Sequence, residues 1–366
     1  MDHIAKTKNY SNIQTIAIIY LDGIPCKKQI HEIVKYVYHN YNKLNTLKYE
    51  DHYSFIYNEI TEEDIYKEIS NFNEKLWEIY IFIPDLKQNK SKLLIKCSHI
   101  IFDGASLVYL INQISLFSNS MNLNSKKEKK YKQKYSINDK KICNNNYKFV
   151  DFSLGNVDDL KKISKFYNTT LNNIFISILA DSCNSDIRQK LYMCSAITLK
   201  NPENNSLKNN ISMIKYKCPY KNNIVSTIYY VTKKMNFLKK CHKNNFLTLD
   251  DILLYSGYLL GFEFIADLLC ISDYFLYKNN PFICISNLII SNNLLSFANC
   301  NIMDFSITTN SIQYTNINYI IFYTYLNNIK ISLSYNKKYN YGLNKKSILN
   351  SSRKLWNNLS FYTDLK

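Results

Sequence analysis

The sequence predicts a mixed α/β fold built as two lobes. Segments with apolar residues at 3- and 4-residue steps, which is helical spacing, alternate along the chain with short β-rich apolar runs. At 366 residues the chain is long for one compact core and suits two lobes of about 150 to 200 residues. With 46% hydrophobic and 14% aromatic residues, it can fill a sizeable core and lacks the composition of a disordered protein.

The first lobe is expected to span residues 1–148. Residues 29–44 and 105–117 place apolar side chains on one helical face and therefore predict two helices. Strands are predicted at residues 13–21, 53–57, 77–83 and 93–101.

A lysine-rich stretch ends this lobe. Residues 126–148 contain nine lysines against Glu128 and Asp139, and almost no aliphatic side chains. The stretch predicts an exposed connector with a net charge of +7, the nine lysines minus the two acids.

The second lobe, residues 149–366, is predicted to mix helices and strands to its end. The polar run 168–170 has side chains that cap helix N-termini, so a helix is expected to begin at Leu171. Helices are predicted at residues 157–167, 171–181, 220–240, 249–270 and 345–362. Strands are predicted at residues 191–198, 211–218, 282–290, 303–311, 319–326 and 330–335.

The charge and the cysteines limit the class of protein. A net charge of +17 favours anionic partners such as nucleic acid, coenzyme A phosphates, an acidic carrier protein or an anionic membrane surface, although lysine also serves as an ordinary surface residue. The ten cysteines are scattered without a C-x-x-C pair, so we expect reduced thiols and neither a metal site nor a disulfide framework. This favours a cytoplasmic protein.

No membrane-targeting segment is predicted. The polar N-terminus lacks the apolar core of a signal peptide. The most apolar stretch, residues 252–277, is interrupted by Glu263, Asp267 and Asp273, which favours a buried or amphipathic helix over a membrane span.

One histidine stands out among the six. His99 lies at the end of an apolar predicted strand and is followed by Asp103 and Gly104 before a predicted helix. An imidazole titrates near neutral pH and can accept a proton from an attacking hydroxyl or amine. An aspartate at this spacing can orient the ring and the loop, and a glycine permits a tight turn. The pattern also fits a hydrogen-bonded core histidine.

The order H-x-x-x-D-G, after a strand and before a helix, resembles the active-site motif of the thioester-dependent acyltransferase superfamily. This superfamily includes nonribosomal peptide condensation domains, alcohol O-acetyltransferases, wax-ester synthases and chloramphenicol acetyltransferase. Four more segments are similar to family stretches in the same order: 43–47 to P-x-L-R-T-x-F, 165–176 to T-x-N-D-x-x-x-A, 194–200 to V-P-V-N-L-R, and 285–288 to S-N-x-G. Asn210 stands where a Gly-Asn pair usually follows.

The resemblance implies a fold and a mechanism. It implies two chloramphenicol acetyltransferase-like lobes with mixed sheets and a tunnel between them, in which His99 is the catalytic base and Asp103 organises the site. The backbone near Gly104, with Ser286 and Asn287, would then stabilise the oxyanion or bind substrate.

The chain also departs from the family pattern. Ser98 stands where a second histidine is frequent, and it is a further substrate-binding candidate. Lys200 replaces the arginine that pairs with the motif aspartate, which weakens that contact because a lysine cannot bind a carboxylate through two parallel hydrogen bonds. The glycine after Ser286 and Asn287 is missing.

The expected activity is acyl transfer from acyl-CoA or a phosphopantetheine thioester, such as an acidic carrier protein, to a small alcohol or amine. The expected protein is a monomer without a metal or a permanently bound cofactor. Two alternatives remain open: a catalytically degenerate binding protein, for which Lys200 leaves room, and a basic nucleic-acid-binding protein, which the charge and abundant tyrosines would suit.

Overall fold

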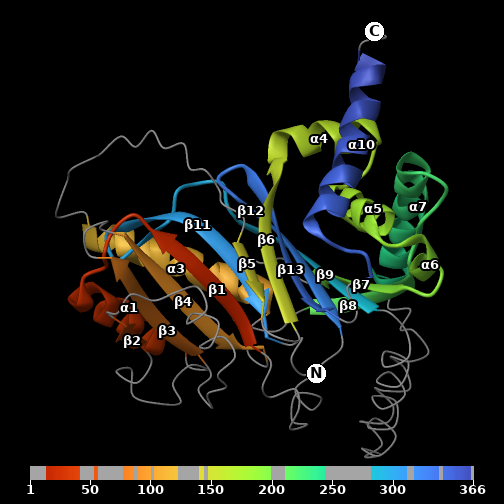
Figure 1. Cartoon of the computed structure of the whole chain (residues 1–366). Helices are drawn as coiled ribbons and strands as arrows, with labels where there is room; N and C mark the ends of the chain where they lie inside the picture. Colours follow the sequence, from red (N-terminus) through yellow and green to blue (C-terminus); the bar gives the residue numbers. More distant parts are fainter. Residues whose placement is uncertain are drawn as a thin grey trace, which may run out of the picture.

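A computed structural model describes most of the chain. The described residues are 14–41, 53–56, 77–85, 90–99, 103–122, 140–143, 147–198, 211–243, 282–310, 317–337 and 341–363. Within them the structure has two sheets, each of which contains both parallel and antiparallel strand pairs, together with helices that pack on the sheets (Figure 1). This confirms the predicted α/β class with two sheets. The helix expected at residues 249–270 lies outside the described residues.

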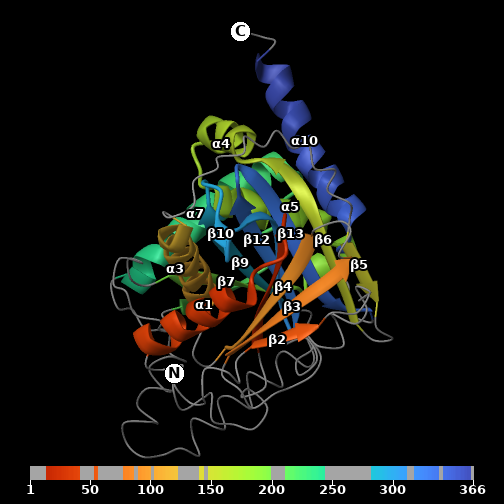
Figure 2. The same ribbon diagram turned by 90° about the vertical axis from the view of Figure 1, so that its left-hand side faces the viewer.

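The first sheet has six strands in the order β10-β11-β1-β4-β3-β2. Its strands are β1 (Gln14–Leu21), β2 (Tyr53–Ile56), β3 (Trp77–Asp85), β4 (Lys90–Ser98), β10 (Ser296–Phe297) and β11 (Cys300–Thr309). Helices α1 (Lys27–Asn40) and α3 (Gly104–Asn122) pack with one face of this sheet, and Figure 2 shows them side by side. Neighbouring strands run antiparallel except for β2 and β3, which are parallel.

Strand β1 is buried on both faces. Ala17 and Ile19 pack into the core under α1 and α3, whereas Ile16 and Ile18 belong to a separate apolar cluster on the opposite face. Because side chains alternate along a strand, burial on both faces requires a continuous apolar run, and the sequence of β1 has one.

The second sheet has seven strands in the order β5-β6-β13-β12-β9-β7-β8. Its strands are β5 (Lys140–Cys143), β6 (Tyr147–Asn156), β7 (Tyr192–Thr198), β8 (Ile211–Lys217), β9 (Phe282–Ser291), β12 (Asn318–Tyr325) and β13 (Asn328–Asn336). The helices after β6 are α4 (Val157–Phe166), α5 (Leu171–Ser182), α6 (Ser185–Arg188), α7 (Ile224–Lys243) and α10 (Lys345–Thr363). Figure 1 shows α5, α7 and α10 together on one side of this sheet.

Helix α5 begins where the sequence predicts. Thr170 is its N-cap residue, and the side chain of Thr170 accepts a hydrogen bond from the Asn173 backbone N–H at 3.3 Å. This satisfies one of the N–H groups that a helix N-terminus leaves without a partner. The ring of Phe175, on α5, stacks on Phe322 of β12 with 4.1 Å between centroids, which fastens the helix to the centre of the sheet.

The two sheets do not divide the chain at residue 148. Strand β5 and the start of β6 precede that position and pair in the second sheet, whereas β10 and β11 come from the C-terminal range and join the first sheet beside β1. The division into lobes of 1–148 and 149–366 stays a prediction. No strand was predicted in the lysine-rich connector 126–148, but its segment Lys140–Cys143 pairs with β6.

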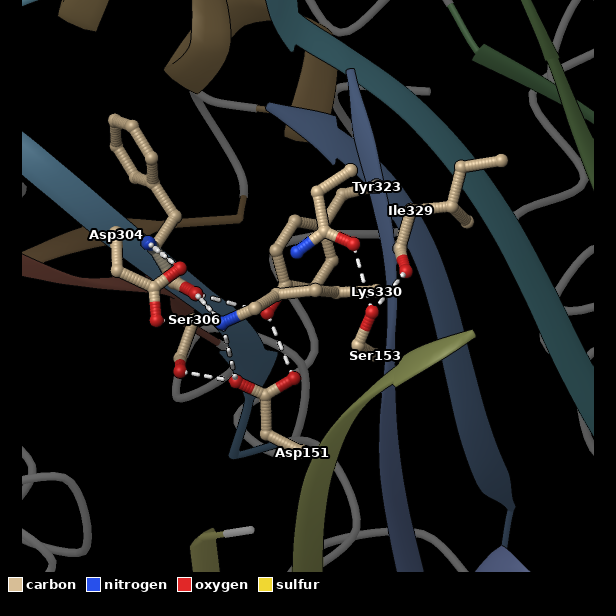
Figure 3. Close-up of polar contacts among 9 residues, drawn as sticks. Asp151, Ser153, Asp304, Ser306, Tyr323, Ile329 and Lys330 are labelled. Atoms are coloured by element: carbon tan, nitrogen blue, oxygen red, sulfur yellow. Dashed lines mark hydrogen bonds and ion pairs between the residues drawn. The ribbon is translucent and has the colours of Figure 1, made fainter. Parts of the chain in front are cut away.

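A buried polar cluster joins the two sheets (Figure 3). Asp151 on β6 and Lys330 on β13 belong to the second sheet, and each is 2% exposed. Lys330 Nζ lies 2.6 Å from Asp304 Oδ2 on β11 of the first sheet and 3.9 Å from Asp151 Oδ2. The Ser306 hydroxyl, also on β11, donates to Asp151 Oδ2. We call these residues, with Tyr323, the inter-sheet cluster.

Tyr323 on β12 completes the inter-sheet cluster. Its hydroxyl lies 2.7 Å from Asp151 Oδ1 and 2.9 Å from the Phe305 carbonyl oxygen. Burial, and then the charge of Asp151, raise the pKa of Tyr323 well above its usual value of 10.0, so the phenol keeps its proton and donates it. Both carboxylate oxygens of Asp151 therefore have hydrogen-bond donors in a site away from water.

Replacement of Lys330 tests how strongly this cluster holds the sheets. Lys330→Met keeps most of the side-chain volume but removes the charge that faces two carboxylates. We expect the free energy of unfolding to fall by about 3–5 kcal/mol in chemical denaturation. Lys161→Met is the matched control, because Lys161 pairs with Asp158 on the surface at 3.8 Å, and we expect a change below about 1 kcal/mol. Equal losses in the two variants would mean that the cluster adds no stability beyond a surface pair.

Candidate active site

The turn between β4 and α3 carries the predicted catalytic residues. Strand β4 ends at Ser98, His99 follows in a turn, and α3 begins at Gly104. Asp103 is 2% exposed and acts as the cap of α3, since its Oδ1 accepts a hydrogen bond from the Ser106 N–H at 2.6 Å and its carbonyl accepts one from Leu107 at 3.0 Å. A carboxylate at a helix N-terminus is also stabilised by the helix dipole.

The protonation of His99 follows from its surroundings. Burial lowers the pKa of His99 below its usual value of 6.5, and a hydrogen bond to its own backbone and the charge of Asp103 oppose this in part. The imidazole is therefore neutral near pH 7, and one ring nitrogen has a lone pair to accept a proton. This is the state that a general base requires.

Packing at Gly104 links this turn to strand β9. A Cβ atom at Gly104 would lie 3.0 Å and 3.1 Å from the two methyl carbons of Leu288. Leu288 directly follows two further predicted site residues, Ser286, which is part-buried, and Asn287, which is exposed. The absence of a side chain at Gly104 thus allows the start of α3 to lie against this part of β9.

Further along, α3 is fastened to both sheets. The Asn112 amide nitrogen donates to the Ile290 carbonyl of β9 at 3.0 Å. The Ser115 hydroxyl accepts a hydrogen bond from the Ser296 backbone N–H of β10 at 2.8 Å. Because these bonds fix the helix, they also fix the turn before it, which holds His99 and Asp103.

The structure thus places Gly104, which directly follows Asp103, against Leu288 of β9. Ser98 is buried at the end of β4. Lys200 lies outside the described residues, so its pairing with Asp103 stays a prediction.

Sequence reasoning missed a buried amide beside this turn. Gln14 on β1 is 3% exposed and lies directly opposite Ser98 in the ladder between β1 and β4. The Gln14 backbone N–H donates to Asn310 Oδ1 at 2.7 Å, but Gln14 Oε1 has no hydrogen-bond partner in the part of the chain that the structure describes. A buried acceptor without a partner is costly, which makes Gln14 a candidate for substrate contact. A glutamine at the start of a strand carries no sequence signal of this.

Comparison with known proteins shows what fold this is. No family model and no curated sequence matches the chain. Solved structures do match over nearly the whole length, at low identity. The wax ester synthase/diacylglycerol acyltransferase from Marinobacter aquaeolei VT8 is 12% identical with a TM-score of 0.54, and the match covers 99% of this chain and 98% of that one.

Two other solved structures extend this result. The first condensation domain of the calcium-dependent antibiotic synthetase matches with a TM-score of 0.59 and 8% identity, over 97% of this chain and 91% of that one. The trichothecene 15-O-acetyltransferase from Fusarium sporotrichioides matches with a TM-score of 0.59 and 10% identity, over 97% and 92% of the two chains. The chain therefore has the condensation-domain and acyltransferase fold that its motifs predict. Among the described helices, none has both the length and the apolarity needed to cross a bilayer.

A titration of His99 tests the electrostatics of this turn. We expect a pKa below 6.5 in an NMR titration of the labelled imidazole, with His99→Gln used to assign the signal. Asp103→Asn keeps an oxygen to cap α3 but removes the charge, so it should lower the pKa of His99 further. Since the unfolded chain binds this proton near pH 6.5 and the folded chain only at lower pH, stability should be lost as pH falls below 6.5. A rise in the pKa of His99 in Asp103→Asn would contradict this account.

Proposed function

We propose that the chain is an acyltransferase that moves an acyl group from a thioester donor to a hydroxyl or amine acceptor, with His99 as general base. The observation that carries this proposal is the position of His99, part-buried in the turn after β4 and under the charge of Asp103, the residue that caps α3. The fold, shared with acyltransferases and condensation domains, supports it.

In the proposed reaction, His99 accepts the proton of the acceptor as the acceptor oxygen or nitrogen attacks the thioester carbonyl. The tetrahedral oxyanion then collapses and expels the thiolate. The protonated His99 returns the proton to this sulfur, so that the products are an ester or amide and a free thiol. No charge or proton remains on the protein after one cycle.

In this proposal three groups stabilise the oxyanion. The first backbone N–H groups of α3, beginning at Gly104, have no partner within a helix and lie at the positive end of its dipole. Ser286 and Asn287 directly precede Leu288, the residue on β9 that packs against Gly104, and we assign them the role of polar side chains at this site. Asp103 keeps a positioning role, because its carboxylate is already engaged with the Ser106 N–H.

The co-substrate follows from the same proposal. We propose acyl-CoA or a phosphopantetheine thioester on an acidic carrier protein as the donor, entering through a tunnel between the lobes. No permanently bound cofactor or metal takes part in this scheme. We propose that the protein acts as a cytoplasmic monomer. In this scheme Ser98 and Gln14 contact the acceptor, and Lys200 pairs with the carboxylate of Asp103.

Removal of the base should abolish most of the turnover. His99→Ala is expected to lower kcat by about 10² to 10⁴-fold, measured as thiol release from a panel of acyl thioesters with alcohol and amine acceptors. His39→Ala, on the exposed last turn of α1, is the matched control and should keep the wild-type rate. Unchanged melting temperatures would show that both variants fold. If His99→Ala works as fast as the wild type, His99 is not the base.

A further inference from the structure

Helix α7 has an unusual outer face. Its inner stripe of Ile228, Val231 and Met235 is buried in the core of the second sheet. On the side away from this core, Tyr229 is 58% exposed and Phe237 is 66% exposed. Figure 1 shows α7 at the right-hand edge of the molecule, outside α5. A phenylalanine two-thirds exposed on a helix surface leaves apolar area that a partner can bury.

The same region carries positive charge without acidic residues. Residues 211–243 contain eight lysines and neither aspartate nor glutamate: Lys215, Lys217, Lys221, Lys233, Lys234, Lys239, Lys240 and Lys243. Helix α4 differs, because its exposed lysines Lys161 and Lys162 pair with Asp158 and Asp159 at 3.8 Å and 3.1 Å. The charge of α7 is therefore not balanced by its own segment and favours an anionic partner.

Aromatic and basic side chains alternate along this face. One stripe down the helix consists of residues spaced three and four positions apart: Tyr230, Lys233, Phe237 and Lys240. The Lys221 ammonium lies 4.3 Å from the ring centroid of Tyr230, within cation–π distance. Rings and ammonium groups thus share one surface. We call these residues, with Tyr229, the α7 face.

We propose that the α7 face binds the surface of an anionic lipid bilayer. Exposed aromatic rings fit the boundary between headgroups and acyl chains, while lysines on long stems reach the lipid phosphates and carboxylates. A protein partner fits less well, because lysine is depleted in protein–protein interfaces and carboxylates that would complement the face must be placed one by one. A membrane supplies a continuous anionic plane. This inference does not depend on acyl transfer.

Vesicle flotation of the full-length protein tests the proposal. We expect binding to vesicles that contain about one third phosphatidylserine in phosphatidylcholine, and weak binding to pure phosphatidylcholine. Raising the salt concentration should weaken the binding, because exposed charges are screened over about 8–10 Å near physiological ionic strength. Equal binding to both vesicles, or binding to neither, would overturn the proposal.

Substitutions locate the surface. The double variant Lys233→Ser, Lys240→Ser should lower the partition coefficient for the anionic vesicles by about tenfold or more. Phe237→Ser should also weaken binding, and this loss should persist in high salt because it removes apolar contact. The double variant Lys161→Ser, Lys162→Ser changes the net charge equally on α4 and should bind like the wild type. If this control loses as much affinity as the α7 variant, the net charge of the chain is responsible and the α7 face is not a binding surface.

Discussion

The inter-sheet cluster is the contact on which the rest of the architecture depends. Lys330, buried on the second sheet, reaches Asp304 on the first, while Asp151 receives hydrogen bonds from Ser306 and Tyr323 (Figure 3). A buried charge is tolerated when partners are present at good geometry and is very costly without them. This condition restricts how the sheets can dock. A slip of one residue in β6 would turn Asp151 into the apolar core occupied by Val150 and Phe152.

The geometry of the candidate active site depends on how the two sheets pack together. Helix α3 directly follows β4, a strand of the first sheet. A hydrogen bond from Asn112 and close packing at Gly104 nevertheless hold α3 against β9, a strand of the second sheet. The start of α3, and with it the turn that holds His99, is therefore positioned by contacts to both sheets. The α7 face lies on the other side of the second sheet, so the chemistry and the proposed membrane contact occupy separate surfaces of one scaffold.

Sequence pattern was informative where local rules decide the outcome. The strand–turn–helix order around His99, the cap of α5 at Thr170 and most strands of the second sheet follow from apolar periodicity and side-chain capping. Strand β6 was missed because Asp151 and Ser153 interrupt its apolar run, and β5 was missed because its lysines resemble a solvated connector. The ion pairs of Lys330 were not predicted, because Asp151 and Asp304 lie far from it in the sequence.

The sequence alone indicated the α/β class and the strand–turn–helix order around His99 and Asp103, because each depends on neighbours within a few positions. The tertiary structure decided that β10 and β11 return to the first sheet, that Leu288 lies against Gly104, and that Gln14 is buried opposite Ser98. These contacts join residues up to about 300 positions apart, and one chain pattern is compatible with many such pairings. The pairing that forms is the one in which buried charges and hydrogen-bonding groups find partners. These partners are present only once the two sheets have packed together.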